Sequence, residues 1–310
     1  MPRKVRVTTA SFHGIPTPSV ESNRAFACTS VEAAAAEEAD LVCLPETLLE
    51  IGLPHEERPV AEAVPGPTVD ALSGLAKKHR LWVVAPISRR SAAGVVENSA
   101  VVIDRGGEIA GIYSKVHPTI GECRRRSIMP GADATVIDTD FGRLGLAICY
   151  DIGWPDHWQS LADQGAELVV WPSAYDGGFP LQAYAWLHNY YVASSVRTEH
   201  SRIIDVTGRI LVSTSRWHRF ATETIDLEKE LFHIDDQVEK LHRVQLELGS
   251  RARVEALTEE HVFTLESNDP AWPMARIKTE YGLESYRDYH RRAEDVQHES
   301  RNAASLLAGA

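Results

Sequence analysis

Four side chains in this sequence could together carry out covalent chemistry: one cysteine, one lysine and two glutamates. Cys149 lies at the end of the apolar run GRLGLAICYD (142–151), just before a turn at Gly153. Ligands usually bind at the carboxyl ends of strands in α/β folds, so a thiol at this point is well placed to act as a nucleophile. Because an unperturbed thiol has a pKa of about 8.5, it needs a base or a nearby cation to react at neutral pH.

Glu46 is the candidate base. It follows the apolar run LVCLPE (41–46), directly after Pro45. A carboxylate in such a poorly solvated position is expected to have a raised pKa, which suits a general base. From this segment alone, an ordinary loop glutamate is an equally good interpretation.

Lys115 and Glu122 both lie in the segment YSKVHPTIGE. The lysine follows a predicted strand (111–114), and a lysine at such a place is usually a solvated edge charge. Glu122 could reach back towards Lys115 across the turn at Pro118. By themselves Lys115 and Glu122 are weak evidence for a catalytic site, and they support one only together with Cys149 and Glu46.

The other cysteines have weaker claims to chemistry. Cys43 is in the middle of a predicted strand and Cys28 in a predicted alanine-rich helix. Cys123, beside Glu122, is a second possible thiol, but its arginine-rich surroundings predict a loop. For Cys149 itself the common alternative is a buried core cysteine, since free cysteines behave mostly as small apolar residues.

Other kinds of chemistry lack their sequence patterns. The chain has 13 histidines but no HExxH or other helical pair of metal ligands. It also lacks the GxSxG elbow of serine hydrolases and the glycine-rich loops GxxxxGK[ST] and GxGxxG. We therefore predict an activity that uses neither a metal nor a cofactor.

The elements predicted around these four side chains fit a layered α/β fold. Apolar or alternating runs predict strands at 4–11, 41–46, 81–87, 99–115 (two strands joined at 105–107), 142–149, 166–173 and 201–214 (a hairpin). Helical composition or spacing predicts helices at 20–39, 68–80, 154–166 and 181–191. This alternation, with hairpins among it, favours an α/β architecture with mixed sheets.

The sequence changes character after about residue 230. Residues 231–310 are rich in charge and contain few patterns of buried strands. We predict a core of residues 1–230 and a C-terminal extension of residues 231–310 that packs on the core or on a partner subunit. Its last ten residues are expected to be frayed.

Composition narrows the possible partners and compartment. Of the 310 residues 44% are hydrophobic and 25% charged, as in a globular protein. The net charge of -12 argues against nucleic acid, and the only tight basic run is Arg124–Arg126. There is no apolar stretch of signal-peptide or membrane-spanning length. Four cysteines without a CxxC pair suggest a reducing cytoplasm.

Three segments together resemble the nitrilase superfamily of carbon–nitrogen hydrolases. They are LVCLPET around Glu46, IYSKVHPTIGE around Lys115 and GRLGLAICYDIGWPDHW around Cys149, in this order. The resemblance extends through WPSAYDGG (171–178) and the IIDVTGRIL hairpin, and covers roughly residues 4–228. Each motif alone is weak, whereas all three in order are a strong signal.

The resemblance implies a four-layer αββα sandwich and a catalytic Glu–Lys–Cys triad. The triad falls on Glu46, Lys115 and Cys149, with Glu122 as a second glutamate that shapes the site. It also implies subunits that pair through their sandwiches, so at least a homodimer. The segments around the nucleophile and at 171–178 place Tyr150, Trp154, Trp171 and Ser173 as substrate-binding residues, with Tyr175 and Phe179 as possible pocket walls.

The substrate is predicted from the residues that follow Cys149. The resemblance implies an amide or carbamoyl substrate, because Tyr150-Asp151 stands where nitrilases tend to have Trp-Glu. Gly153 stands where many relatives have arginine, so a substrate carboxylate would need Arg197 or one of Arg124–Arg126.

We therefore favour hydrolysis of a linear amide to a carboxylic acid and ammonia through a thioester. N-carbamoyl-amino-acid hydrolysis, nitrile hydrolysis and a non-catalytic ligand-binding role are the alternatives, in that order. The four-residue set of Glu46, Lys115, Glu122 and Cys149 argues against the binding role.

Overall fold

The structure is a computed structural model that describes residues 3–15, 17–54 and 59–308. The chain divides into two compact units, which we call the core unit (Lys4–Ile225) and the tail unit (Asp226–Ala310 with the first three residues). Within the described ranges, no helix is both long enough and apolar enough to span a bilayer.

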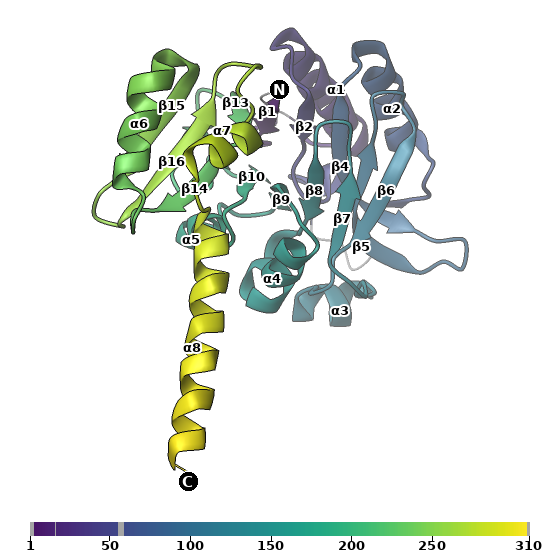
Figure 1. Cartoon of the computed structure of the whole chain (residues 1–310). Helices are drawn as coiled ribbons and strands as arrows, with labels where there is room; N and C mark the ends of the chain where they lie inside the picture. Colours follow the sequence, from purple (N-terminus) through teal and green to yellow (C-terminus); the bar gives the residue numbers. More distant parts are fainter. Residues whose placement is uncertain (1–2, 16, 55–58, 309–310) are drawn as a thin grey trace. The chain divides into compact units, whose positions relative to one another are not determined.

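The first sheet of the core unit starts from three parallel strands and ends in a meander (Figure 1). Strands β1, β2 and β4 are parallel, and β5 and β6 continue the sheet in antiparallel fashion. The order is β13 (Phe220–Asp226), β1 (Lys4–Ala10), β2 (Leu41–Cys43), β4 (Trp82–Arg90), β5 (Val96–Ile103) and β6 (Ile109–Ser114), with β3 (Ala61–Glu62) beside β4.

The second sheet is also built around three parallel strands. Strands β8, β9 and β10 are parallel, and antiparallel strands flank them on both sides. The order is β12 (Ile210–Ser213), β11 (Arg202–Ile204), β10 (Tyr191–Val196), β9 (Leu168–Ser173), β8 (Arg143–Leu146) and β7 (Thr135–Asp138).

Each sheet is covered by a pair of helices, and the two sheets face each other. Helices α1 (Val20–Ala36) and α2 (Pro67–His79) share a hydrophobic core with the first sheet, and α4 (Pro155–Asp163) and α5 (Phe179–His188) with the second. Between the sheets, Ser195 Oγ donates to the carbonyl of Ala10 at 2.7 Å, and Ser11 Oγ lies 2.8 Å from Ser201 Oγ. The core unit is therefore a four-layer αββα sandwich, which confirms the predicted fold class.

Local sequence explains where these helices begin. Ser19 caps α1 in a capping box with Ser22, and Pro67 and Pro155 occupy the first turns of α2 and α4. Proline is favoured there because the first helical N–H groups have no partner within the helix. Strands β2 and β4 are almost wholly buried, which explains why their sequences are continuous apolar runs rather than alternating ones.

Two strands near the predicted nucleophile and base are shorter than the sequence predicted. The run at 142–149 forms a strand only to Leu146, and the run at 41–46 only to Cys43. In both cases the apolar residues continue past the last ladder pairing into a buried turn. Burial therefore extends further along the chain than strand geometry does.

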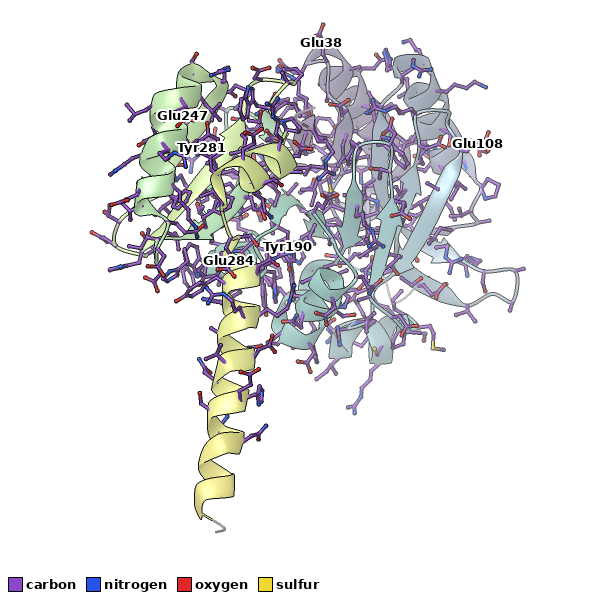
Figure 2. All side chains as sticks on the ribbon, in the orientation of Figure 1. Glu38, Glu108, Tyr190, Glu247, Tyr281 and Glu284 are labelled. Carbon is purple, nitrogen blue, oxygen red and sulfur yellow. The ribbon has the colours of Figure 1, made fainter. Side chains whose placement is uncertain are left out.

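The tail unit corrects the prediction that residues 231–310 contain few strands. Strands β14 (Glu230–His233), β16 (Val262–Ser267) and β15 (Ala252–Leu257) form an antiparallel sheet. Helices α6 (Val238–Leu248) and α7 (Met274–Tyr281) share a core with it that includes Phe232, Phe263 and Ile277. Figure 2 labels Tyr281 and Glu247, whose hydroxyl and carboxylate are 3.1 Å apart and tie α7 to α6.

The end of the chain also differs from the prediction of a frayed terminus. Helix α8 runs from Tyr286 to Ala308, and only residues 309–310 of the predicted frayed segment lie outside the described residues. Near its start, the hydroxyl of Tyr289 bonds to Asp235 at 2.6 Å.

Candidate active site

The four predicted residues come from different elements of the core unit and meet at the strand ends. Glu46 follows β2 and Lys115 follows β6, so both belong to the first sheet. Cys149 follows β8 of the second sheet, and Glu122 lies on the short helix α3 (Ile120–Arg126).

Lys115 is the centre of the cluster. Its Nζ atom is 2.9 Å from Glu46 Oε1 and 2.8 Å from Glu122 Oε2. Lys115 is only 1% exposed, so its ammonium group is held by carboxylates in place of water. A buried charge is tolerated when it is paired and hydrogen-bonded in this way.

Asn98 is a member of the site that sequence reasoning missed. From β5 its side-chain nitrogen donates to Glu46 Oε1 at 2.8 Å and to Glu122 Oε1 at 2.9 Å. The backbone N–H of Lys115 bonds to the Asn98 carbonyl at 2.8 Å, so the hairpin register sets the two residues beside each other. A register shift at Val102/Ile103 displaces the pairing by one residue, so counting outward from the predicted turn at 105–107 would have placed Glu97 opposite Lys115.

Glu122 has two tasks, and both follow from its place on α3. It forms a capping box with Thr119, in which Glu122 Oε2 accepts from the Thr119 N–H at 2.7 Å. The same oxygen accepts from Lys115. The structure also corrects the predicted loop around Cys123, which is an exposed residue of this helix.

The electrostatics of the cluster overturn one expectation. Burial alone would raise the pKa of Glu46, but the charges of Lys115 and Arg197 outweigh it and hold that pKa below its ordinary value. The predicted raised pKa is therefore wrong, because the sequence does not reveal how many cations surround a carboxylate. Burial opposes the charge on Lys115, yet the negative charges of Glu46, of Cys149 when it is ionised, and of Glu122 raise its pKa.

Cys149 lies in a tight buried turn. Its φ angle is +47°, in the left-handed region that non-glycine residues rarely adopt, and such strain is common at functional sites. The Trp171 indole N–H donates to the Cys149 carbonyl at 3.0 Å and fixes the turn to β9. Cys149 is 7% exposed, so the turn keeps the sulfur almost out of water.

The thiol of Cys149 is protonated at neutral pH. Burial and the negative charge of Glu46 raise its pKa to about 12. Lys115 and hydrogen bonds from the Ala174 N–H and the Ser173 hydroxyl act in the opposite direction and favour the thiolate. The resting arrangement is a neutral thiol and an ionised carboxylate, which is the state in which Glu46 can accept a proton.

The predicted substrate-binding residues divide by exposure. Ser173 and Trp171 are fully buried beside Cys149. Tyr150 and Trp154 are 42% and 36% exposed and pack edge to face, with ring centres 5.0 Å apart. They therefore form an aromatic surface at the nucleophile turn. Burial raises the pKa of the nearby Tyr175 hydroxyl to about 12, and the negative charge of ionised Cys149 adds to this effect.

The arginines suggested for a substrate carboxylate differ in their surroundings. Arg197 Nε donates to the Glu46 carbonyl at 2.9 Å, and another of its nitrogens bonds to Thr47. Arg126 pairs with Glu50, while Arg124 and Arg125 are exposed on α3. Arg197 thus contacts the backbone of the predicted base itself, whereas Arg126 contacts the same loop at Glu50.

Among the described residues one trio has the composition of a metal site. Ligand-type atoms of His117, Asp151 and His157 lie within 4.8 Å of one another. Both oxygens of Asp151 already accept hydrogen bonds, including one of 2.6 Å from Tyr113. His157 Nε2 lies 3.3 Å from the Leu146 carbonyl. These bonds account for the trio's closeness.

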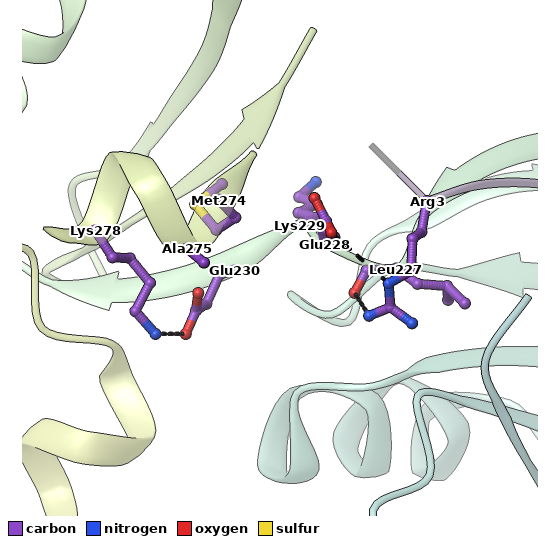
Figure 3. Close-up of a pocket in the computed structure, with 8 residues that line it drawn as sticks. All are labelled: Arg3, Leu227, Glu228, Lys229, Glu230, Met274, Ala275 and Lys278. Atoms are coloured by element: carbon purple, nitrogen blue, oxygen red, sulfur yellow. Dashed lines mark hydrogen bonds and ion pairs between the residues drawn. The ribbon is translucent and has the colours of Figure 1, made fainter. Parts of the chain in front are cut away.

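A hollow lies in the tail unit (Figure 3). It has a volume of about 270 Å³ and is lined by Arg3, residues 227–230, Met274, Ala275 and Lys278. Lys278 pairs with Glu230 at 2.7 Å, and Arg3 lies 3.9 Å from Glu228. Lys229 of the lining pairs with Glu255 and Glu266, which lie outside it, and the lining contains none of the predicted catalytic residues.

Comparison with known proteins assigns the family. The model of the carbon–nitrogen hydrolase family matches residues 8–230, most of the chain. The chain belongs to this family, as the three motifs predicted, and is a hydrolase of the nitrilase superfamily.

Individual relatives are distant. The chain is 28% identical over 163 residues to "Probable nitrilase C965.09" of Schizosaccharomyces pombe, covering 47% of this chain and 59% of that protein. It is 26% identical over 250 residues to the omega-amidase NIT2 of Mus musculus, covering 73% and 90%.

A solved structure supports the fold. The amidase from Nesterenkonia sp. AN1, in a mutant with the acetamide moiety of fluoroacetamide on its active-site cysteine, superposes with a TM-score of 0.62. It is 19% identical, covering 77% of this chain and 95% of that one. At this identity the likeness concerns the fold.

The arrangement around Asn98 yields a first prediction. Asn98→Ala should lower the free energy of unfolding by about 2–4 kcal/mol, because two hydrogen bonds to charged groups are lost. Urea denaturation checks this. Ser99→Ala, on the same strand, is the control and should cost less, since Ser99 makes its 3.1 Å contact only with the Ser114 hydroxyl. Equal stability of Asn98→Ala and the native chain would contradict the role given to Asn98.

Proposed function

We propose that this protein hydrolyses a linear amide to a carboxylic acid and ammonia, with Cys149 as nucleophile, Glu46 as general base and acid, and Lys115 as electrophilic support. The observation that carries the proposal is the ammonium group of Lys115 held between Glu46 and Glu122, close enough to Cys149 for their charges to interact. Glu122 positions Lys115 and keeps it charged.

The chemistry follows from these charges. Glu46 accepts the thiol proton as the Cys149 sulfur bonds to the carbonyl carbon, and negative charge develops on the substrate oxygen. The Lys115 ammonium and the backbone N–H of Tyr150 stabilise that charge. The carbon–nitrogen bond then breaks, and the proton on Glu46 leaves with ammonia.

The thioester is then hydrolysed at the same centre. Glu46 takes a proton from water, whose oxygen attacks the thioester carbonyl. The sulfur–carbon bond breaks, the proton returns to the Cys149 sulfur, and the carboxylic acid departs. The proton is thus returned to the thiol at the end of each cycle.

An amide is the preferred substrate class for two reasons. Tyr150-Asp151 follows the nucleophile, and the omega-amidase and the Nesterenkonia amidase among the relatives are named for amides. We assign substrate contacts to Tyr150, Trp154, Trp171 and Ser173. Ser173 would act beside the sulfur and the exposed pair Tyr150 and Trp154 would face the rest of the substrate.

Ammonia release tests this proposal. The purified chain is incubated with simple aliphatic and aromatic amides, N-carbamoyl amino acids and nitriles, and ammonia and carbon dioxide are measured. We expect ammonia without carbon dioxide, from amides first. Carbon dioxide released from carbamoyl substrates would favour an N-carbamoyl-amino-acid hydrolase. A preference for nitriles would favour a nitrilase. No release, together with no alkylation of Cys149 by iodoacetamide, would favour a non-catalytic binding protein.

The pH dependence gives a second prediction. Since the pKa of Glu46 lies below its ordinary value and that of Cys149 is about 12, kcat/KM should be flat from about pH 5 to 9. The same ionised Glu46 stabilises the fold above its unfolded pKa of about 4.3, and this stabilisation is lost as pH falls through the lower native value. Circular dichroism at each pH separates unfolding from titration. A half-maximal rate between pH 6 and 8 would mean that another group is the base.

We also propose a cytoplasmic homo-oligomer, at least a dimer, in which residues 231–310 pack on the core or on a partner subunit. The paired sandwiches implied by the family resemblance support this. Light scattering of the full chain tests it, and a monomer at micromolar concentration would contradict it.

A further inference from the structure

Asp151 is a buried charge near the nucleophile that the proposed mechanism does not use. It lies two residues after Cys149 and is inaccessible to solvent. An ionised carboxylate in such a place is tolerated only when donors surround it. The identity of those donors indicates what Asp151 does.

One group of donors comes from the nucleophile turn itself. Asp151 Oδ2 accepts from the Ile148 N–H at 2.8 Å, and the Asp151 N–H bonds to the Ile148 carbonyl at 3.0 Å. These two bonds close the turn around Cys149 and help to hold its left-handed backbone. The Asp151 carbonyl also accepts from the Trp158 indole at 3.1 Å, which anchors the turn to α4.

The other donors come from the segment that carries Lys115. The Tyr113 hydroxyl donates to Asp151 Oδ2 at 2.6 Å, two residues before the lysine. The backbone N–H of His117 donates to Asp151 Oδ1 at 2.9 Å, two residues after it. The ring of His117 adds a contact of 3.0 Å through Nδ1. The Asp151 carboxylate therefore accepts hydrogen bonds from residues on both sides of Lys115.

We propose that Asp151 is a positioning residue that joins the Cys149 turn to the Lys115 segment and so sets the nucleophile against the ammonium group. The two segments belong to different sheets of the sandwich, and Asp151 links them directly beside the reacting atoms. This inference rests on the proposed function, since it assumes that Cys149 and Lys115 act together.

The aromatic surface shares this anchor. The His117 ring stacks on Trp154 with centres 4.1 Å apart and planes 10° apart, and Trp154 meets Tyr150 edge to face. A displacement of Asp151 should therefore move both Lys115 and the exposed rings of Trp154 and Tyr150. The effect on turnover is expected to exceed the effect on substrate binding, because reacting atoms demand closer alignment than a binding surface does.

Kinetics of Asp151→Asn test the proposal. This variant keeps the shape of the side chain but replaces one accepting oxygen by an NH₂ group. We expect kcat for the best amide to fall on the order of 100-fold, with KM within about 3-fold. The alkylation rate of Cys149 by iodoacetamide, followed on its peptide by mass spectrometry, should fall as well. The exposed Cys123 in the same sample should react at its native rate.

A matched control separates positioning from general destabilisation. Asp205 is also buried, and its carboxylate accepts from Thr207 and the Arg209 N–H in the β11–β12 hairpin. Asp205→Asn should lower the melting temperature but leave kcat of the folded protein within about 2-fold.

Tyr113→Phe removes the hydroxyl that donates to Asp151 and accepts from the Val116 N–H at 3.2 Å, but it keeps the ring. It therefore tests the link even where Asp151→Asn folds poorly. We expect kcat to fall about 10-fold, and less than multiplicatively when combined with Asp151→Asn. Native kcat in folded Asp151→Asn and Tyr113→Phe, while Cys149→Ala is inactive, would overturn the positioning role and leave the proposed function standing. Activity in Cys149→Ala would overturn both.

Discussion

The Cys149→Ala variant should lose amide turnover almost completely, on the order of 10⁶-fold in kcat, as when a hydrolase loses its nucleophile. The loss follows from the mechanism, because the Cys149 sulfur forms the thioester and its charge interacts with both Glu46 and Lys115. The fold should persist, since removing one sulfur from a turn leaves the hydrogen bonds of Asp151 and Trp171 in place. Ammonia release and thermal melting measure the two outcomes.

Cys123→Ala is the matched control for this variant. Cys123 is exposed on α3 and makes no side-chain contact required by the mechanism. It should retain native turnover, while iodoacetamide should still inactivate the enzyme through Cys149. Turnover that survives Cys149→Ala, or that depends on Cys123, would contradict the assignment of the nucleophile.

Glu46→Gln should have the next largest effect, a fall in kcat of about 10³-fold from the loss of a general base. Its pH dependence should also change. With the charge of Glu46 removed, one cause of the raised pKa of Cys149 disappears, so the residual rate should increase with pH as thiolate forms. The native enzyme should show no such increase between about pH 5 and 9, because its base is ionised throughout.

Glu50→Gln provides the comparison for Glu46→Gln. Glu50 lies four residues further on the same loop and pairs with Arg126 and Ser88, away from Lys115. Its replacement removes an equal charge and should leave kcat unchanged. A native, pH-independent kcat in Glu46→Gln would show that another group accepts the thiol proton.

The sequence predicted the structure well where a local pattern of residues has one structural explanation. Continuous apolar runs predicted the buried strands around Glu46 and Cys149, because parallel strands covered on both faces have no room for polar residues. The order of the glutamate, lysine and cysteine motifs predicted which strand ends would come together at the site. The strand boundaries were wrong by a few residues, since Leu44 and Ile148 are buried in turns as fully as in strands.

The properties missed by the sequence depend on distant neighbours. The lowered pKa of Glu46 results from Lys115 and Arg197, which are far from it in the chain. Asp151 and Asn98 are ordinary polar residues until their donors and acceptors are known. The strands β15 and β16 were overlooked because the turn between them uses His261 with a φ of +57° where glycine or asparagine would be the usual signal.

In the proposed mechanism an acyl group is transferred to Cys149, and trapping that intermediate tests the mechanism most directly. The enzyme is mixed with its best amide substrate, quenched in acid within milliseconds and digested. The masses of the cysteine-containing peptides are then measured by mass spectrometry. We predict that the Cys149 peptide gains the mass of the acyl group in the native protein, and that Cys123 does not. Turnover with no adduct on Cys149 at any quench time, or an acyl group on another residue, would contradict the account.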